Sequence, residues 1–329
     1  MAVGSGGFGV LHPVDGVRIG IASAGIKKAG RKDVVVFELA EGSTVAGVFT
    51  KNAFCAAPVT IAKSHLQQSG ARYWLVNTGN ANAGTGPSGL EAAKQCCSAL
   101  ADLAGCPTEQ VLPFSTGVIG EPLPADKIIA ALPAALADLS AEHWSDAASG
   151  IMTTDTRPKA CSRQFEWQGK IITVTGISKG AGMIKPNMAT MLGYVACDAV
   201  IAQTLLQRLV SDAAEQSFNR ITVDGDTSTN DACMLVASGA SGVEISEREP
   251  ELLAAMTDLI NEVFLDLAQA IVRDGEGATK FVEVAVCGAK SSEEALKVAY
   301  TVAESPLVKT ALFASDPNWG RILAAIGRA

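Results

Sequence analysis

Two patterns of apolar residues alternate along the chain. Apolar residues three and four positions apart predict helices over 88–104, 126–139, 141–151, 202–218, 251–272 and 292–304, with a last helix from 322. Apolar runs between turn residues predict strands over 33–39, 44–50, 73–77, 111–115, 162–167, 170–178, 190–197, 281–286 and 308–313. The glycine-rich residues 1–30 are expected to be irregular. Strands and helices intermixed in this way, with hairpin-like neighbours, predict an α+β fold of stacked sheets covered by helices.

Composition narrows the class of protein. The 329 residues allow one large domain or two ordinary ones, and 48% hydrophobic with only 5% aromatic residues predicts a core of small aliphatic side chains. Lys and Arg number 26 against 34 Asp and Glu, a net charge of −8. This net negative charge argues against sequence-independent nucleic-acid binding, which needs clustered cations. It does not exclude a small anionic substrate.

No metal site or membrane segment is expected. The eight cysteines form no Cys-x-x-Cys pair and there are three histidines, so we expect buried, reduced thiols in a cytoplasmic protein. The acidic loop 224–231 lacks the spacing and the final glutamate of a calcium loop. The N-terminus lacks the basic start and apolar core of a signal peptide, and no apolar run approaches 18 residues.

The stretch 179–192 carries the candidate chemistry. Its glycines allow close approach of the backbone to a ligand, and Pro186 stiffens the loop just before Thr190, which opens an apolar run. A threonine is a nucleophile when a base takes its proton, and the chain's own amine is such a base when threonine is the first residue. The alternative is that Thr190 is simply a good strand former. In the same way, the run 116–120 after a strand either aims backbone N–H groups at developing negative charge or is an ordinary turn.

The residues 179–184 and 186–192 resemble the self-cleaving signature of the glutamate N-acetyltransferase family, also called ornithine acetyltransferases, of arginine biosynthesis. Segments 47–52, 56–59, 152–159 and 316–321 are similar to the same family, so the resemblance extends over almost the whole chain. It implies a layered αββα-type sandwich of the ornithine acetyltransferase or DmpA-like kind. It also implies self-cleavage between Ala189 and Thr190, giving an alpha chain, 1–189, and a beta chain, 190–329, that carries the nucleophile.

The resemblance implies roles for single residues. Thr190 becomes the N-terminal nucleophile, Thr116 and Gly117 stabilise the oxyanion, and the substrate is bound by Thr153, Lys179 and Glu276 together with Thr190. The implied reaction moves an acetyl group from N-acetylornithine to glutamate through an acetyl-threonine, without a cofactor. Some members also accept acetyl-CoA, which the sequence leaves open. The implied assembly is a heterotetramer of two alpha and two beta chains.

Two other classes stay open at this point. Family members usually continue for a further segment that brings an asparagine and a threonine into the substrate site, and we expect this chain to lack it. An inactive, truncated relative that only binds a partner is therefore one alternative. The other is an aminopeptidase or amidase of related fold with the same N-terminal nucleophile, in which water rather than glutamate takes the acyl group.

Overall fold

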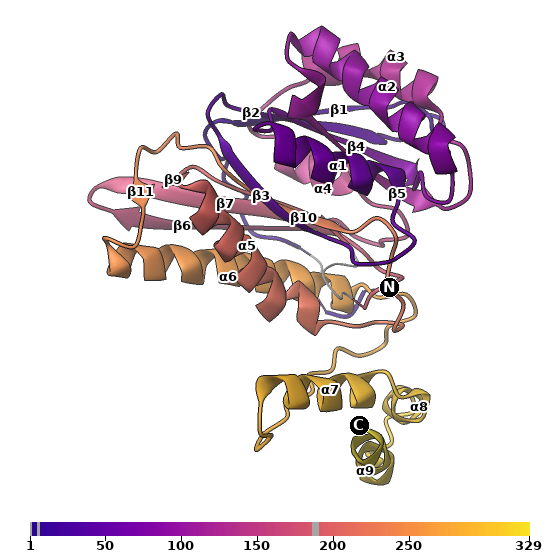
Figure 1. Cartoon of the computed structure of the whole chain (residues 1–329). Helices are drawn as coiled ribbons and strands as arrows, with labels where there is room; N and C mark the ends of the chain where they lie inside the picture. The colour runs from indigo at the N-terminus through magenta and orange to yellow at the C-terminus, as the bar shows by residue number, and fades with distance from the viewer. Residues whose placement is uncertain (1, 5–6, 186–190) are drawn as a thin grey trace.

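Two large β-sheets stacked face to face form the centre of the molecule, and helices cover their outer faces (Figure 1). The computed structural model describes residues 2–4, 7–185 and 191–329. Three groups of buried side chains define the layers: one between the sheets and one beneath the helices on each outer face. The predicted αββα sandwich is confirmed.

The first sheet has four strands in the order β1-β2-β4-β5, of which only β4 and β5 are parallel. Its strands are β1 (Val17–Ala22), β2 (Val34–Leu39), β4 (Tyr73–Asn80) and β5 (Val111–Val118). Strand β1 lies within the segment expected to be irregular, and that prediction is wrong. The glycines of this segment favoured the prediction of irregular structure, but β1 is buried at every position except Arg18.

The second sheet has five strands in the order β3-β10-β8-β7-β6. They are β3 (Thr44–Phe49), β6 (Lys159–Trp167), β7 (Lys170–Lys179), β8 (Leu192–Cys197) and β10 (Ala232–Ala237). Strand β8 lies between antiparallel β7 and parallel β10, so segments before and after residue 190 share one sheet. The predicted hairpin of β6 and β7 is confirmed, with Gln168 and Gly169 both at positive φ, as a two-residue turn requires. A small parallel pair joins β9 (Val200–Ile201) to β11 (Glu244–Ile245).

Helices α2 (Gly86–Ala104) and α3 (Ala125–Ala137) cover the first sheet, and α5 (Gln203–Gln216) and α6 (Pro250–Arg273) cover the second. The shorter α1 (Ala57–Gln68) and α4 (Trp144–Gly150) contribute side chains to the layer between the sheets. Single 3-10 turns occur at Thr108–Gln110 and Phe218–Arg220. None of the helices in the described ranges has the length and apolarity needed to cross a membrane.

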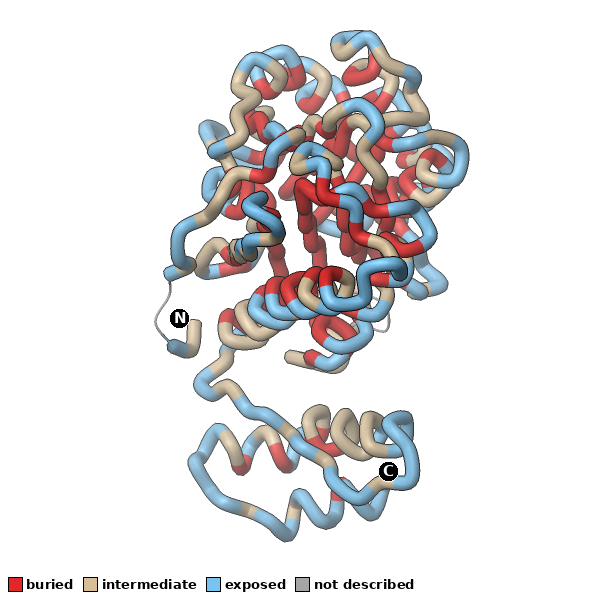
Figure 2. The backbone as a smooth tube through the Cα atoms, turned by 90° about the vertical axis from the view of Figure 1, so that its left-hand side faces the viewer, coloured by how far each residue is buried: buried red, intermediate tan, exposed pale blue. Residues whose placement is uncertain are grey.

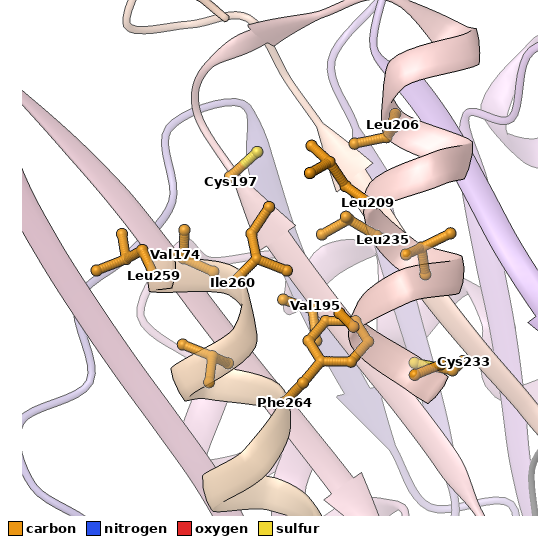
Figure 3. Packing of buried hydrophobic residues seen from close by; sticks show 14 of the residues in the cluster. Val174, Val195, Cys197, Leu206, Leu209, Cys233, Leu235, Leu259, Ile260 and Phe264 are labelled. Atoms are coloured by element: carbon orange, nitrogen blue, oxygen red, sulfur yellow. The ribbon is translucent and has the colours of Figure 1, made fainter. Parts of the chain in front are cut away.

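The cores are mainly aliphatic, as the composition predicts. Beneath α5 and α6, Leu206, Leu209, Ile260 and Phe264 point at the strands of the second sheet (Figure 3). A group of aromatic residues lies between the two sheets, where the Tyr194 ring is 5.2 to 5.6 Å from the rings of Phe37, Phe114 and Trp74. All eight cysteines are free thiols; Cys55 and Cys287 are exposed, which differs from the expectation of buried thiols.

Residues 292–328 form a separate unit of three helices below the sandwich (Figure 1): α7 (Ser292–Ala303), α8 (Pro306–Phe313) and α9 (Trp319–Arg328). Most of this unit is exposed or half-buried (Figure 2), and its buried centre in the described structure consists of Val302, Val308 and Ala325. Two strand predictions are wrong here. Residues 281–286 form no ladder with any described strand, and residues 308–313 belong to α8.

Candidate active site

A cavity of about 560 Å³ lies where the ends of β4, β5 and β7 meet the turn after α6. The predicted site residues that line it are Thr116, Gly117, Thr153, Lys179 and Glu276. They come from four separate parts of the chain, up to 160 residues apart in sequence (276 − 116). Ala189 and Thr190 lie outside the described residues, but Met191, the next residue along the chain, also lines the cavity.

Thr116 and Gly117 lie within strand β5, near its end, and not in a turn after it, as the sequence suggested. Gly117 has φ +140°, and a Cβ at this position would lie 2.3 Å from the carbonyl carbon of Gly79 on the neighbouring strand. Only glycine fits this approach of two backbones. The hydroxyl oxygen of Thr116 accepts a hydrogen bond of 3.3 Å from the ammonium of Lys179. Its own proton is therefore free to be donated to a ligand in the cavity.

Lys179 ends strand β7 and is 8% exposed. Burial lowers the pKa of its ammonium, and the positive charge of Lys159 adds to this effect. The carboxylates of Asp155, Asp231 and Glu276 act in the opposite direction. Lys179 is thus a cation taken out of water and compensated by surrounding acids, which suits it to bind an anionic group that enters the cavity.

A buried network of charges holds the walls of the cavity together. The carboxylate of Asp155 accepts hydrogen bonds from the backbone N–H groups of Thr153 at 3.0 Å and Gly180 at 2.7 Å, and from the Lys159 ammonium at 2.6 Å. Lys159 also donates to Asp274, at the end of α6, over 2.7 Å. Burial alone would raise the pKa of Asp155, but the ammonium groups of Lys179 and Lys159 outweigh it and lower the pKa to about 2. The sequence reasoning missed this network, although Asp155 and Lys159 lie in the motif 152–159.

Glu276 reaches the cavity from the turn after α6. Its backbone N–H donates to the carbonyl of Ala181 over 2.8 Å, which joins this turn to the glycine-rich loop after β7. Its carboxylate lies directly against Gly182, because a Cβ on Gly182 would be 2.6 Å from Oε1 of Glu276. The glycine thus makes room for an acid that lines the same cavity as Lys179 and interacts with its charge.

The acidic loop 224–231 supports the site from the other side. The Asp224 carboxylate accepts hydrogen bonds from the backbone N–H groups of Met183 at 2.7 Å and Ile184 at 2.9 Å. Asp231 lines the cavity, and its Oδ2 is buried with no hydrogen-bond partner among the described residues. Burial raises the pKa of Asp231 well above its ordinary value, which a hydrogen bond with Ser228 and the charge of Lys179 only partly offset. No cluster of histidine, cysteine and acidic residues suited to a metal ion occurs in the described ranges.

Comparison with known proteins places this arrangement in a family. The model of the ArgJ family matches residues 18–329. The chain belongs to the ArgJ family. It is 65% identical, over 330 aligned positions, to the arginine biosynthesis bifunctional protein ArgJ of Pseudomonas fluorescens. The protein of the same name from Pseudomonas syringae pv. tomato is 64% identical. Both alignments cover 100% of this chain and 81% of the relative.

Solved ArgJ structures match with less overlap. The ornithine acetyltransferase of Mycobacterium tuberculosis, solved in complex with ornithine, is 33% identical and covers 55% of this chain and 96% of its own, with a TM-score of 0.46. The ArgJ protein of Bacillus halodurans is 34% identical and covers 54% of this chain and 92% of its own, also with a TM-score of 0.46. The resemblance inferred from residues 179–192 is confirmed by the family match and the two relatives.

Proposed function

We propose that this chain is a glutamate N-acetyltransferase, or ornithine acetyltransferase, that moves an acetyl group from N-acetylornithine to glutamate in arginine biosynthesis. Membership of the ArgJ family supports the reaction class. One structural observation carries the proposal: the cavity beside Met191 gathers a candidate oxyanion pair, a buried cation and a facing acid. An acyl-transfer reaction on an amino acid needs these three elements around its nucleophile.

The nucleophile would arise by self-cleavage. The Thr190 hydroxyl attacks the peptide carbonyl of Ala189, the C–N bond breaks, and the Thr190 amine leaves as the acyl group moves to the oxygen. Water then hydrolyses this ester, which frees the hydroxyl and a terminal amine. An α-amino group has an unperturbed pKa of about 8, so a useful fraction is neutral near neutral pH and can act as the local base.

Acetyl transfer then proceeds in two half-reactions. The Thr190 amine takes the hydroxyl proton, the oxygen attacks the acetyl carbonyl of N-acetylornithine, and ornithine leaves with a proton on its α-nitrogen. The α-amine of glutamate next attacks the acetyl ester and releases the threonine. Thr116 and Gly117 would stabilise both tetrahedral oxyanions. Lys179 would pair with the α-carboxylate of each substrate, Thr153 would contact the substrate, and Glu276 would hold the ammonium of ornithine. The scheme requires no cofactor.

The two cleavage products would remain one folded unit. Strand β8 of the second product lies between β7 of the first and β10, and β3 of the first pairs with β10. We propose that two such units form a heterotetramer of two alpha and two beta chains, which light scattering on the purified protein would measure. We place it in the cytoplasm, where its amino-acid substrates are made and used.

The test is acetyl transfer from N-acetylornithine to glutamate, measured by mass spectrometry with and without acetyl-CoA. We expect N-acetylglutamate and ornithine in equal amounts without any added cofactor. Release of free acetate at a rate unaffected by glutamate would show a hydrolase and contradict the proposal. The arm with acetyl-CoA decides whether this chain also uses that donor.

A further inference from the structure

The proposed function, on which this inference rests, poses a problem of charge. The two amino acids that use the cavity share an α-carboxylate and an α-nitrogen, but their side chains end in opposite charges. Ornithine ends in an ammonium, and glutamate ends in a carboxylate. A single charged group that attracts one of them repels the other, so the cavity needs a separate partner for each side chain.

The cavity does contain charges of both signs. Glu276 and Asp231 are its acids, and the proposed function assigns the ornithine ammonium to Glu276. Its cations, apart from Lys179, all come from one segment, the loop 23–33 between β1 and β2, here called the basic loop. These cations are Lys27, Lys28 and Arg31.

The basic loop is held in place over the cavity. The buried carboxylate of Asp33 accepts hydrogen bonds from the backbone N–H groups of Ala24 at 2.6 Å and Ile26 at 2.7 Å. Its carbonyl accepts a further bond of 2.9 Å from Thr78 on β4. From the other side, the ammonium of Lys127 on α3 donates to the carbonyl of Gly25 over 3.0 Å. The cations of the loop are thus carried by a fixed backbone.

Two of the three cations are used to attach the loop. The stem of Lys27 packs on Gly79, where an added Cβ would lie 3.0 Å from its Cγ, and its ammonium pairs with Glu121. The guanidinium of Arg31 donates to the carbonyl of Met152, next to Thr153. Through these contacts the loop reaches two walls of the cavity. One is the end of β5, because Gly79 packs against Gly117, and the other is the segment around Thr153.

Lys28 lies between these two attachments. It lines the cavity, and its ammonium forms no ion pair or hydrogen bond with any residue in the described part of the chain. It is exposed, so binding a carboxylate would cost it little desolvation. Among the described residues, Lys28 is therefore a cation without an ion-pair partner that lines the cavity, on a loop fixed to both of its walls.

We propose that Lys28 binds the side-chain carboxylate of the acceptor glutamate and so selects the acceptor of the second half-reaction. Lys27 and Arg31 position the loop that carries it. The donor does not use Lys28, because the side chain of N-acetylornithine is itself a cation.

The experiment measures the two half-reactions of the purified enzyme separately. Exchange of labelled ornithine into N-acetylornithine reports the first half-reaction, and transfer to glutamate or to its neutral analogue glutamine reports the second. In Lys28→Gln we expect the KM for glutamate to rise about tenfold, the effect of losing one charge-assisted hydrogen bond. The preference for glutamate over glutamine should fall by a similar factor, while ornithine exchange changes less than about twofold.

Two further variants control for a purely structural effect of Lys28→Gln. Lys28→Arg keeps the charge and should retain most of the preference for glutamate over glutamine. Lys32→Gln removes a lysine of the same loop that does not line the cavity and pairs only distantly, at 3.9 Å, with Asp146, and it should behave as wild type.

The proposal is overturned if Lys28→Gln keeps the wild-type preference for glutamate over glutamine. It is also overturned if the KM values for glutamate and N-acetylornithine rise by the same factor. Absence of ornithine exchange in the wild-type enzyme would overturn the proposed function itself. Normal exchange with unaltered acceptor preference would overturn only the role of Lys28.

Discussion

At the scale of single residues, the Thr116 hydroxyl is the group whose role follows most directly from its contacts. It accepts a hydrogen bond from Lys179, so its proton is free to be donated, and in the proposed mechanism the acceptor is the oxyanion. Thr116→Val removes the hydroxyl at nearly constant volume and should lower kcat about 100-fold, the usual cost of losing one oxyanion donor. Steady-state transfer rates at saturating substrates measure this loss.

Thr116→Ser is the matched variant, because it keeps the hydroxyl and removes only a methyl group. It should keep most of the wild-type kcat, within about tenfold. A kcat for Thr116→Val equal to that of Thr116→Ser would show that the hydroxyl takes no part in the reaction. Gly117 cannot be tested as cleanly, since an added Cβ would collide with the backbone of Gly79.

The residues of the site differ in how far the sequence could predict them. Lys179 and Thr153 are predictable because the segments around them resemble a known family, and Glu276 because that resemblance implies a role for it. Asp231 and Lys28 were missed, since nothing local marks them: an acid in an acidic loop and a lysine in a basic loop are usually solvated. Asp231 is distinguished by its burial, and both residues by lining a cavity built by segments far apart in sequence.

At the scale of elements, the Asp155 carboxylate joins the Thr153 loop to the end of β7 and, through Lys159, to the end of α6. Asp155→Asn keeps the shape but removes a buried negative charge that acts on both Lys159 and Lys179, and Lys159 keeps only its bond to Asp274. We expect the free energy of unfolding at pH 7 to fall by about 3–5 kcal/mol, as when one partner of a buried ion pair is removed. Urea unfolding measures this change.

The stability difference between wild type and Asp155→Asn should depend on pH in a definite direction. The pKa of Asp155 is lowered on folding from 3.8 to about 2, so its charge stabilises the fold above pH 4, and this stabilisation is lost as the pH falls toward 2. The difference in free energy of unfolding between wild type and Asp155→Asn should therefore decrease as the pH falls from about 4 to about 2. Asp212→Asn, at an exposed acid on α5, should shift stability by less than about 0.5 kcal/mol at any pH. A difference in free energy of unfolding between wild type and Asp155→Asn that stays constant from pH 7 to pH 2.5 would refute the ion-pair explanation.

Long periodic elements were predictable from sequence, and short apolar runs were not. The 24-residue α6 matches the expected helix closely, because an apolar stripe of that length suits no other element. The run 308–313 reads as a strand by itself, but Ser305 caps a helix and Pro306 begins it, as the bond from Val308 N–H to the Ser305 hydroxyl shows. Residues 281–286 form an apolar run of the kind found in strands, but a strand also needs a partner, which the local sequence does not reveal.

At the scale of the whole molecule, the layered class of fold was predictable, but the pairing of strands across it was not. Residues 39 and 44 are five positions apart, and yet β2 ends in one sheet and β3 begins in the other. The insertion of β8 between β7 and β10 is likewise a long-range pairing. In the proposed cleavage before β8, both products would contribute strands to the second sheet.

The central claim is that Thr190 becomes a nucleophile with a free amine when the chain cleaves itself. The most direct measurement is the intact mass of freshly purified wild type and Thr190→Ala, combined with the acetyl-transfer assay on the same samples. We predict two fragments meeting at Thr190 and active transfer for wild type, and one uncut, inactive chain for the variant. An active wild type made of a single uncut chain, or a variant that is still cut and still transfers acetyl groups, would contradict the account.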